Sequence, residues 1–209
     1  MGIAFYSANS TPPDPFENFT GDDFTGTNGE PLNINYWFDQ ELGSSWLIQN
    51  NKATVNHSGA TESMSDSVFT LSGDYDIQID FETDSLPPDA IVRFITLSED
   101  REFYEIIGVQ DQGGGIVFQI IYKTNNVWDF GISNVVRTNT YGKLRIIRSG
   151  SNISVHYQDG VSGWSEAYSK TQDTAARLIR FHAKTYNPGD SLVATFDNFL
   201  INSGTLITP

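Results

Sequence analysis

The sequence contains no cysteine among its 209 residues. Disulfide bonds, thiolate metal sites and cysteine nucleophiles are therefore excluded. Positive charge is also scarce, because 12 Lys and Arg residues stand against 26 Asp and Glu residues and leave a net charge of −14. This excess of negative charge repels nucleic acid and anionic membranes, so we expect neither as a partner.

Long apolar runs are missing as well. No stretch reaches the roughly 18 consecutive apolar residues that a membrane-spanning helix needs. The N-terminal segment, residues 1–21, has neither a basic region nor an apolar core, so we expect no signal peptide and no membrane insertion. His57, His156 and His182 are not spaced as a zinc-binding pair. EF-hand, P-loop and nucleophile-elbow motifs are absent too.

Alternation of apolar and polar residues is the dominant pattern that the sequence does contain, and it is typical of strands buried on one face. In residues 74–82 four apolar side chains fall on one face: Tyr75, Ile77, Ile79 and Phe81. Residues 141–164 read as a hairpin and a tight turn, followed by Trp164 as an apolar anchor. About a dozen such strands predict an all-β antiparallel sandwich. Residues 171–177 are the one place where a helical turn is expected.

The strands predict a single domain over residues 22–203, with a short C-terminal tail at 204–209 and an extended N-terminal arm at 1–21. The run Thr11–Pro15 contains three prolines, which favour extended backbone over helix. The arm carries five large apolar residues, which is unusual for a free tail: Ile3, Phe5, Tyr6, Phe16 and Phe19. We expect the arm to dock on a partner subunit, the alternative being a tail that lies on its own domain.

The order of these elements resembles the concanavalin A-like lectin/glucanase superfamily in its laminin-G-like jelly-roll form. The residues that carry the resemblance are Asp22-Asp23-Phe24, Trp46–Lys52, Gly142–Ile146, Ile153–Tyr157, Trp164 and Phe196–Phe199. The resemblance covers about residues 22–203 and implies that the first and last strands lie side by side. It concerns patterns of strands and turns, so it speaks to the fold far more than to function.

Similar domains bind glycans, and others occur in bacteriophage particles as fibre, baseplate or capsid-surface modules. The leading prediction is therefore a non-enzymatic virion structural or attachment protein, assembled in the host cytoplasm and docking on other virion proteins or its own protomers through residues 1–20. The alternative is a lectin-like module that binds a glycan, for example at a cell surface. A glycoside hydrolase or lyase is the third hypothesis.

Two candidate sites follow from the residues and the resemblance. Sugar binding needs exposed aromatic faces beside amides or carboxylates, and the candidates are Trp128 with Asn125, Asn126 and Asp129, then Tyr186. Packing in the core or in a loop is the alternative role for these aromatic residues. Related jelly rolls sometimes hold a structural calcium ion near the paired termini, where the ligands here would be Asp22, Asp23 and Asp197. The alternative is that Asp197-Asn198 pins the strand end through local hydrogen bonds. No other cofactor is expected.

The hypothesis of a glycoside hydrolase or lyase has one strand that could carry catalytic carboxylates. Asp76, Gln78, Asp80 and Glu82 share one face, but they do not match the Glu-x-Asp-x-Glu strand of the superfamily's glucanases. A solvated outer face of a sheet explains the same residues, so no catalytic residue is predicted.

Overall fold

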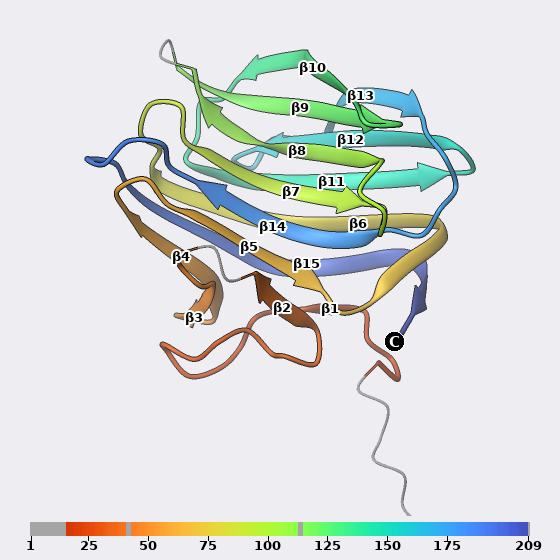
Figure 1. Cartoon of the computed structure of the whole chain (residues 1–209), viewed down its shortest axis with the longest axis horizontal. Coiled ribbons are helices and arrows are strands. Elements are labelled where there is room, and N and C mark those ends of the chain that lie inside the picture. Colours follow the sequence, from red (N-terminus) through yellow and green to blue (C-terminus); the bar gives the residue numbers. More distant parts are fainter. Residues whose placement is uncertain (1–15, 41–42, 113–114, 209) are drawn as a thin grey trace, which may run out of the picture.

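The computed structural model describes residues 16–40, 43–112 and 115–208 and, within them, leaves aside the side chains of 85 and 131–134. Two antiparallel sheets lie face to face, as Figure 1 shows. The eight-stranded sheet has the order β13-β12-β11-β6-β15-β4-β3, with β1 beside β15. Its strands are β1 (Gly21–Asp22), β3 (Leu47–Gln49), β4 (Lys52–Ser58), β6 (Thr70–Ser85), β11 (Tyr141–Ser149), β12 (Asn152–Asp159), β13 (Ser165–Thr171) and β15 (Ser191–Ile207).

The seven-stranded sheet has the order β10-β9-β8-β7-β14-β5-β2. Its strands are β2 (Trp37–Gln40), β5 (Glu62–Ser67), β7 (Ile91–Leu97), β8 (Tyr104–Asp111), β9 (Ile116–Thr124), β10 (Val127–Val136) and β14 (Leu178–Lys184). The predicted all-β antiparallel sandwich is thereby confirmed. In the described part of the chain, no helix is long and apolar enough to cross a bilayer.

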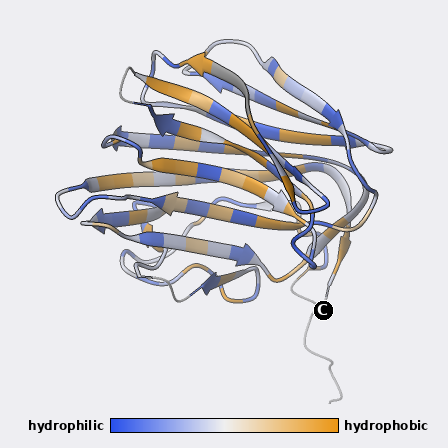
Figure 2. Cartoon of the chain, turned by 45° about the horizontal axis from the view of Figure 1, so that its top comes forward, coloured by the Kyte–Doolittle hydropathy of each residue, from blue (hydrophilic) through white to orange (hydrophobic). Residues whose placement is uncertain are grey.

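Strand β6 illustrates how the alternating sequence builds the core. Tyr75, Ile77, Ile79 and Phe81 point between the sheets and are at most 2% exposed. The Phe81 ring meets Phe118 of the opposite sheet edge-on, with centroids 5.9 Å apart. Figure 2 shows the same alternation of hydrophobic and hydrophilic residues along many strands. Each large apolar side chain buried in this way contributes about 1.5–3 kcal/mol, which makes this layer the main stabilising feature of the fold.

Asparagine and glycine form several of the tight turns. Asn125 and Asn126 have φ angles of 49° and 63° between β9 and β10, as a type I′ turn requires. Asn50 and Asn51 do the same between β3 and β4, with φ angles of 53° and 57°. In the hairpin between β11 and β12, Gly150 takes the positive φ angle, at 59°. Asparagine tolerates this left-handed backbone region better than most residues.

The first and last strands pair, as the resemblance implied. Gly21 lies opposite Leu200 and Asp22 opposite Phe199, so β1 closes one side of β15. A side chain at position 21 would collide with the backbone oxygen of Phe199, only 2.0 Å from the site of its Cβ. Glycine therefore allows the close approach that joins the two ends of the described domain.

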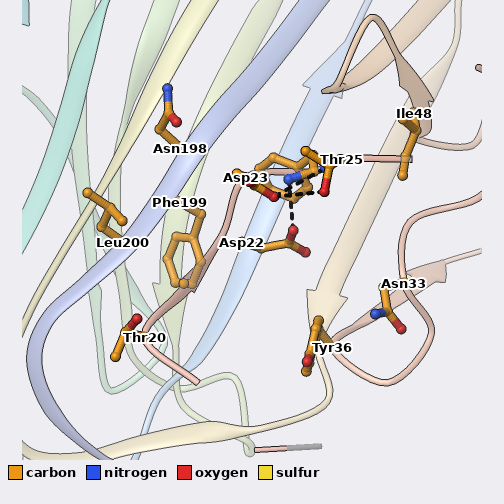
Figure 3. Close-up of a pocket in the computed structure, with 12 residues that line it drawn as sticks. Thr20, Asp22, Asp23, Thr25, Asn33, Tyr36, Ile48, Asn198, Phe199 and Leu200 are labelled. Carbon is orange, nitrogen blue, oxygen red and sulfur yellow. Dashed lines mark hydrogen bonds between the residues drawn. The ribbon is translucent and has the colours of Figure 1, made fainter. Parts of the chain in front are cut away.

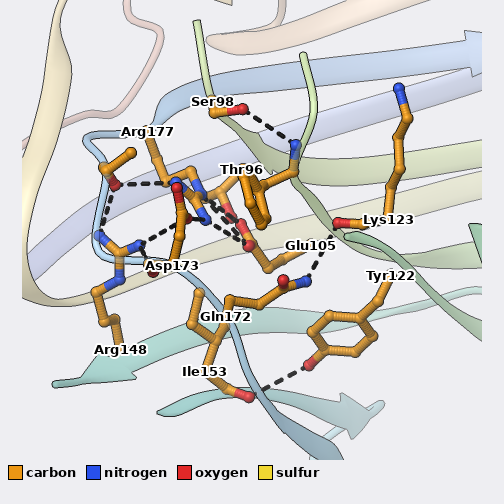
Figure 4. Close-up of polar contacts among 12 residues, drawn as sticks. Thr96, Ser98, Glu105, Tyr122, Lys123, Arg148, Ile153, Gln172, Asp173 and Arg177 are labelled. Carbon is orange, nitrogen blue, oxygen red and sulfur yellow. Dashed lines mark hydrogen bonds and ion pairs between the residues drawn. The ribbon is translucent and has the colours of Figure 1, made fainter. Parts of the chain in front are cut away.

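The predicted helical turn at residues 171–177 is not formed. Instead, β13 ends at Thr171, residues 172–176 have no regular structure, and Leu71 and Arg177 exchange two backbone hydrogen bonds of 2.8 and 2.9 Å. Figure 4 shows why: the buried Arg177 guanidinium contacts Glu105 and Asp173, and Arg148 donates to the carbonyl oxygens of Asp173 and Ala175. These tertiary contacts hold the segment extended and override its local helical tendency.

The predicted anchor Trp164 is partly exposed. Its side chain is 36% accessible, and the Arg145 guanidinium lies 5.4 Å from its ring centroid. The indole therefore packs over a surface arginine instead of entering the core.

Two of the five apolar arm residues pack on their own domain. The Phe19 ring lies 4.3 Å from that of Tyr36 and 5.3 Å from that of Phe69, and Phe16 lies 5.8 Å from Phe69. Ile3, Phe5 and Tyr6 lie outside the described residues. For Phe16 and Phe19 the structure favours the alternative in which the segment lies on its own domain, while docking of residues 3–6 on a partner stays a prediction.

Candidate functional site

The outer face of the seven-stranded sheet combines exposed aromatic residues with buried polar ones. We use "outer face" for the side that points away from the eight-stranded sheet. Strand register aligns its side chains in rows across β10, β9, β8 and β7. One row contains Trp128, Lys123, Tyr104 and Leu97, and a later row contains Gln119, Gly108 and Arg93. Residues far apart in the sequence thus form one continuous surface.

Three aromatic residues form what we call the aromatic platform: Tyr104, Trp128 and Phe130. The Trp128 and Phe130 rings are nearly parallel, with centroids 5.7 Å apart and an interplanar angle of 24°. The Tyr104 ring lies 5.4 Å from Trp128. Trp128 is 42% and Phe130 67% exposed. The side chains of alternate residues on β10 therefore present flat apolar surfaces to the solvent.

A small second core supports the platform. Ile95, Leu97, Ile106 and Ile121 are 1–3% exposed although they belong to the outer face, and Tyr104 and Leu178 pack against them. The Lys123 ammonium lies 5.1 Å from the Tyr104 ring centroid and 5.3 Å from that of Trp128. It also donates a hydrogen bond of 2.6 Å to the carbonyl oxygen of Arg101. These contacts hold the platform in place before any ligand arrives.

Beyond the platform the outer face becomes polar. The Arg93 Nη2 atom donates to Gln119 Oε1 at 2.6 Å, and the Gln119 amide donates in turn to Gln110. Arg93 crosses β8 at Gly108, where a Cβ atom would lie 2.8 Å from the arginine Cγ. Burial lowers the pKa of Arg93 to about 10, so the guanidinium remains charged at neutral pH.

The far side of this face is occupied by closed ion pairs. Arg180 and Asp66 form a two-bond pair with Nε–Oδ1 at 2.5 Å and Nη2–Oδ2 at 2.7 Å. Glu62 accepts from His182 at 2.9 Å and from Lys184 at 3.0 Å. The His182 hydrogen bond is the largest of the effects that together lower the pKa of Glu62 to about 2. Both carboxylates are therefore engaged with basic side chains.

The predicted sugar-binding residues divide between the two sides of the sheet. Trp128 lies on the outer face, and Asn125 and Asn126 form the adjoining turn. Asp129 alternates to the other side, where its carboxylate binds Lys170 at 2.9 Å. Tyr186 is 47% exposed beneath the Lys184 ammonium, 5.2 Å from its ring centroid.

The other members of the site were not predicted from the sequence: Phe130, Tyr104, Lys123, Arg93 and Gln119. The spacing Trp128-x-Phe130 could have identified one of them, because alternate residues of a strand share a face. The remaining four lie on other strands, and only the register of the sheet places them beside Trp128.

The acidic strand considered for catalysis is neutralised by neighbouring strands. Arg145 binds Asp76 through two nitrogens, Lys143 binds Asp80 at 2.7 Å, and Lys52 binds Glu82 at 2.7 Å. Burial raises the pKa of Asp76, but hydrogen bonds from Arg145 and Asn202 outweigh it and the net shift is downward. Such a carboxyl is a poor proton donor at neutral pH.

The predicted calcium ligands are used in local hydrogen bonds. Asp22 accepts from the Trp37 indole and from the Phe24 backbone, both at 2.8 Å, and burial raises its pKa. Asp23 accepts from Thr25 (Figure 3), and Asp197 from the backbone of Asn198 at 2.7 Å. Asp22 and Asp23 line a pocket of about 460 Å³ that Asp197 does not line. No group of three acidic or histidine residues suited to a metal occurs among the described residues.

Comparison with known proteins places the chain by its fold alone. No family model matches the sequence, and no curated protein matches it. Among solved structures, the pseudo β-1,3-glucanase of Mycobacterium tuberculosis matches with a TM-score of 0.71 and 9% identity, over 90% of this chain and 98% of that one. The β-glucanase of Bacillus licheniformis matches with a TM-score of 0.64 and 14% identity, over 87% of this chain and 96% of that one.

A third structure, from a study of endo-acting O-glycanases of the human gut microbiota, matches with a TM-score of 0.68 and 8% identity over 86% of this chain and 96% of that one. The protein therefore has the jelly-roll sandwich fold of glucanase-like proteins, as the resemblance to the concanavalin A-like superfamily predicted. At such low identity the likeness establishes the fold and leaves the function to the site.

Proposed function

We propose that this protein is a non-catalytic glycan-binding module whose ligand lies on the outer face of the seven-stranded sheet. The observation that carries this proposal is the exposed, nearly parallel pair of Trp128 and Phe130, 5.7 Å between centroids. Sugar rings have one or two apolar faces that pack well on flat aromatic side chains. A free surface that exposes two such rings, held by a second core beneath them, is suited to that contact.

The polar half of the same face supplies the hydrogen bonds that sugar hydroxyl groups require. Gln110, Gln119 and Arg93 already hydrogen-bond to one another, so their donors and acceptors are oriented in advance. An apolar surface with a few fixed polar groups is the usual composition of a ligand site in proteins.

The charge state of the carboxylates supports binding without hydrolysis. A glycosidase needs one carboxyl group that holds a proton and a second that is ionised on the same face. On the outer face, Glu62 and Asp66 are both in ion pairs with basic side chains. The fold occurs both in a β-glucanase and in a protein described as a pseudo-glucanase.

The test is a glycan array with three variants. Trp128→Ala and Phe130→Ala should each weaken binding by about tenfold or more, because each removes a stacking surface. Trp164→Ala is the matched control, since Trp164 is 36% exposed but lies on the other sheet. Binding that survives both platform changes would refute the site, and release of reducing ends from β-glucans would refute the non-catalytic assignment.

Incorporation into a virion, expected from the sequence, is a separate proposal. It depends on Ile3, Phe5 and Tyr6, and its test is whether a chain lacking residues 1–15 is still found in assembled particles. A glycan-binding face and a docking arm are compatible in one attachment protein, because they occupy different parts of the chain.

A further inference from the structure

Arg93 lies near the middle of the outer face, where it could contact a bound ligand. Its side chain crosses β8 above Gly108, the residue directly opposite it, and reaches Gln119 on β9. One guanidinium nitrogen donates to Gln119 at 2.6 Å, whereas the Nε atom is buried and has no hydrogen-bond partner. An unsatisfied buried donor is costly, and a ligand oxygen would satisfy it once the side chain shifts, because Nε is closed to solvent in the structure.

The outer face leaves Arg93 without an ion pair, although the charge of the Glu62 carboxylate acts on it from a greater distance. Arg180 is paired with Asp66, and Lys184 with Glu62. His182, the neighbour of Arg93 on β14, hydrogen-bonds to Glu62, and burial lowers its pKa. Among the described residues, no carboxylate forms an ion pair with Arg93 or with Lys123.

Arg93 is one of four basic residues that form no ion pair in the described part of a chain with 26 acidic and 12 basic residues, the others being Arg101, Lys123 and Arg137. Acidic partners are plentiful, and eight of the basic residues do form ion pairs: Lys52, Lys143, Arg145, Arg148, Lys170, Arg177, Arg180 and Lys184. A cation that is largely buried without a partner costs stability. Such a cost is commonly retained where a ligand supplies the missing charge.

We infer, on the basis of the proposed function, that the glycan is acidic and that Arg93 binds its anionic oxygen atoms, while neutral rings stack on Trp128 and Phe130. The chemistry is that of a carboxylate or a sulfate ester, which a guanidinium recognises through two parallel hydrogen bonds. Three strand spacings of about 4.8 Å separate β7 from β10. The ligand is therefore an oligosaccharide that carries its acidic group several units from the stacked ring.

Matched polymers distinguish the two sources of negative charge. Polygalacturonate and its full methyl ester share one backbone and differ in the free carboxylate. Kappa-carrageenan and agarose provide a sulfated and a neutral galactan. The intact chain should bind the charged member of at least one pair about tenfold more tightly than the neutral member. A preference within the galacturonate pair identifies the anion as a carboxylate, and a preference within the galactan pair identifies it as a sulfate ester.

Arg93→Gln should abolish that preference, because the charged polymer loses an ionic contact whereas the neutral polymer loses a hydrogen bond alone. The matched control is Arg101→Gln, which removes an exposed arginine of the β7–β8 turn that also lacks an ion pair among the described residues. Arg93→Lys keeps the charge and loses the planar fork, so it should retain the preference with several-fold weaker binding. This second variant keeps the test valid if Arg93→Gln does not fold.

The outcomes separate this inference from the proposed function. Equal affinity for the charged and neutral members of both pairs would overturn the acidic-glycan inference and leave glycan binding intact. A preference that survives Arg93→Gln, or an Arg93→Lys variant with unchanged affinity, would overturn the role of Arg93. Binding to none of the polymers, charged or neutral, combined with an empty glycan array, would overturn the proposed function itself.

Discussion

At the scale of single residues, Glu105 and Arg177 form an ion pair inside the sandwich. Both side chains are fully buried, with Nε–Oε2 at 3.0 Å, and Thr96 donates to the same carboxylate at 2.6 Å. Arg177→Met alone should lower the free energy of unfolding by about 3–5 kcal/mol, because it leaves Glu105 buried without its partner, and Glu105→Gln should cost less, because Arg177 keeps its contact with Asp173. Urea denaturation measures the loss.

The double variant Glu105→Gln/Arg177→Met removes both charges and should lose much less than the sum of the two single changes. Arg101→Met, at an exposed turn, is the control and should change stability by less than about 0.5 kcal/mol. Strictly additive losses in the double variant would show that the two side chains act independently.

His57 makes the protein sensitive to mild acid. Its ring is 3% exposed and hydrogen-bonds to Ser63 at 2.9 Å, and burial lowers its pKa from 6.5 to about 4. The unfolded chain takes up a proton here below about pH 6.5, whereas the folded chain does so only near pH 4. The contribution of His57 is therefore complete above pH 6.5 and is lost as the pH falls towards 4.

His57→Gln should flatten the dependence of unfolding free energy on pH between 6.5 and 4, by up to about 1.4 kcal/mol per pH unit. Denaturation curves at half-unit steps of pH provide the measurement. Well below pH 4 the slopes of the two proteins should converge, because His57 is protonated in both states there, while Glu62, whose pKa is lowered to about 2, still titrates. Parallel curves over the upper window would contradict the assignment.

At the scale of the strand, β8 depends on one glycine. A Cβ atom at position 108 would lie 2.2 Å from the Val92 carbonyl oxygen and 2.8 Å from the Arg93 Cγ atom. Gly108→Ala should therefore cost about 1–3 kcal/mol and displace Arg93. Gly163→Ala is the control, because no heavy atom lies within 4 Å of the added Cβ. Thermal melts of both variants measure the difference in stability, and equal melting temperatures would refute the close approach of the two strands at Gly108.

Strands were the elements that sequence could predict best. The alternation in residues 74–82 predicted which side chains of β6 are buried, and the Asn125-Asn126 turn followed from the tolerance of asparagine for positive φ angles. The prediction of a helical turn at residues 171–177 was wrong, because the conformation of this segment depends on Glu105 and Arg148, which lie more than twenty residues away in the sequence. Short-range propensity contains no information about such contacts.

The candidate site was only partly predictable for a related reason. Trp128 could be recognised as an exposed aromatic residue near a hairpin tip. Arg93, Gln119 and Tyr104 are inconspicuous in the sequence, and they become a surface only through the order and register of β7, β8, β9 and β10. A site assembled across a sheet is set by strand pairing, which no local pattern determines.

At the scale of the whole molecule, Phe16 and Phe19 fasten the start of the described chain to the sandwich. The variant Phe16→Ala/Phe19→Ala should lower the unfolding free energy by about 2–4 kcal/mol, because two rings leave their contacts with Tyr36 and Phe69. Calorimetry gives the change in melting temperature. Removal of residues 1–15 is the control and should leave the melting temperature nearly unchanged, whereas an equal loss in both proteins would place the anchor earlier in the chain.

The last two strands of the chain occupy interior positions, one in each sheet. β15 lies between β6 and β4, and β14 lies between β7 and β5. During synthesis, therefore, β6 and β4 must wait for residues 191–207, and β7 and β5 for residues 178–184, before either sheet can close. Five of the thirteen strand pairings are consequently delayed until residues 178–207 have been synthesised, which makes folding slow and leaves strand edges open to aggregation in the meantime. The rate at which the nascent protein is shielded by chaperones should matter more for its yield than the stability of the finished sandwich.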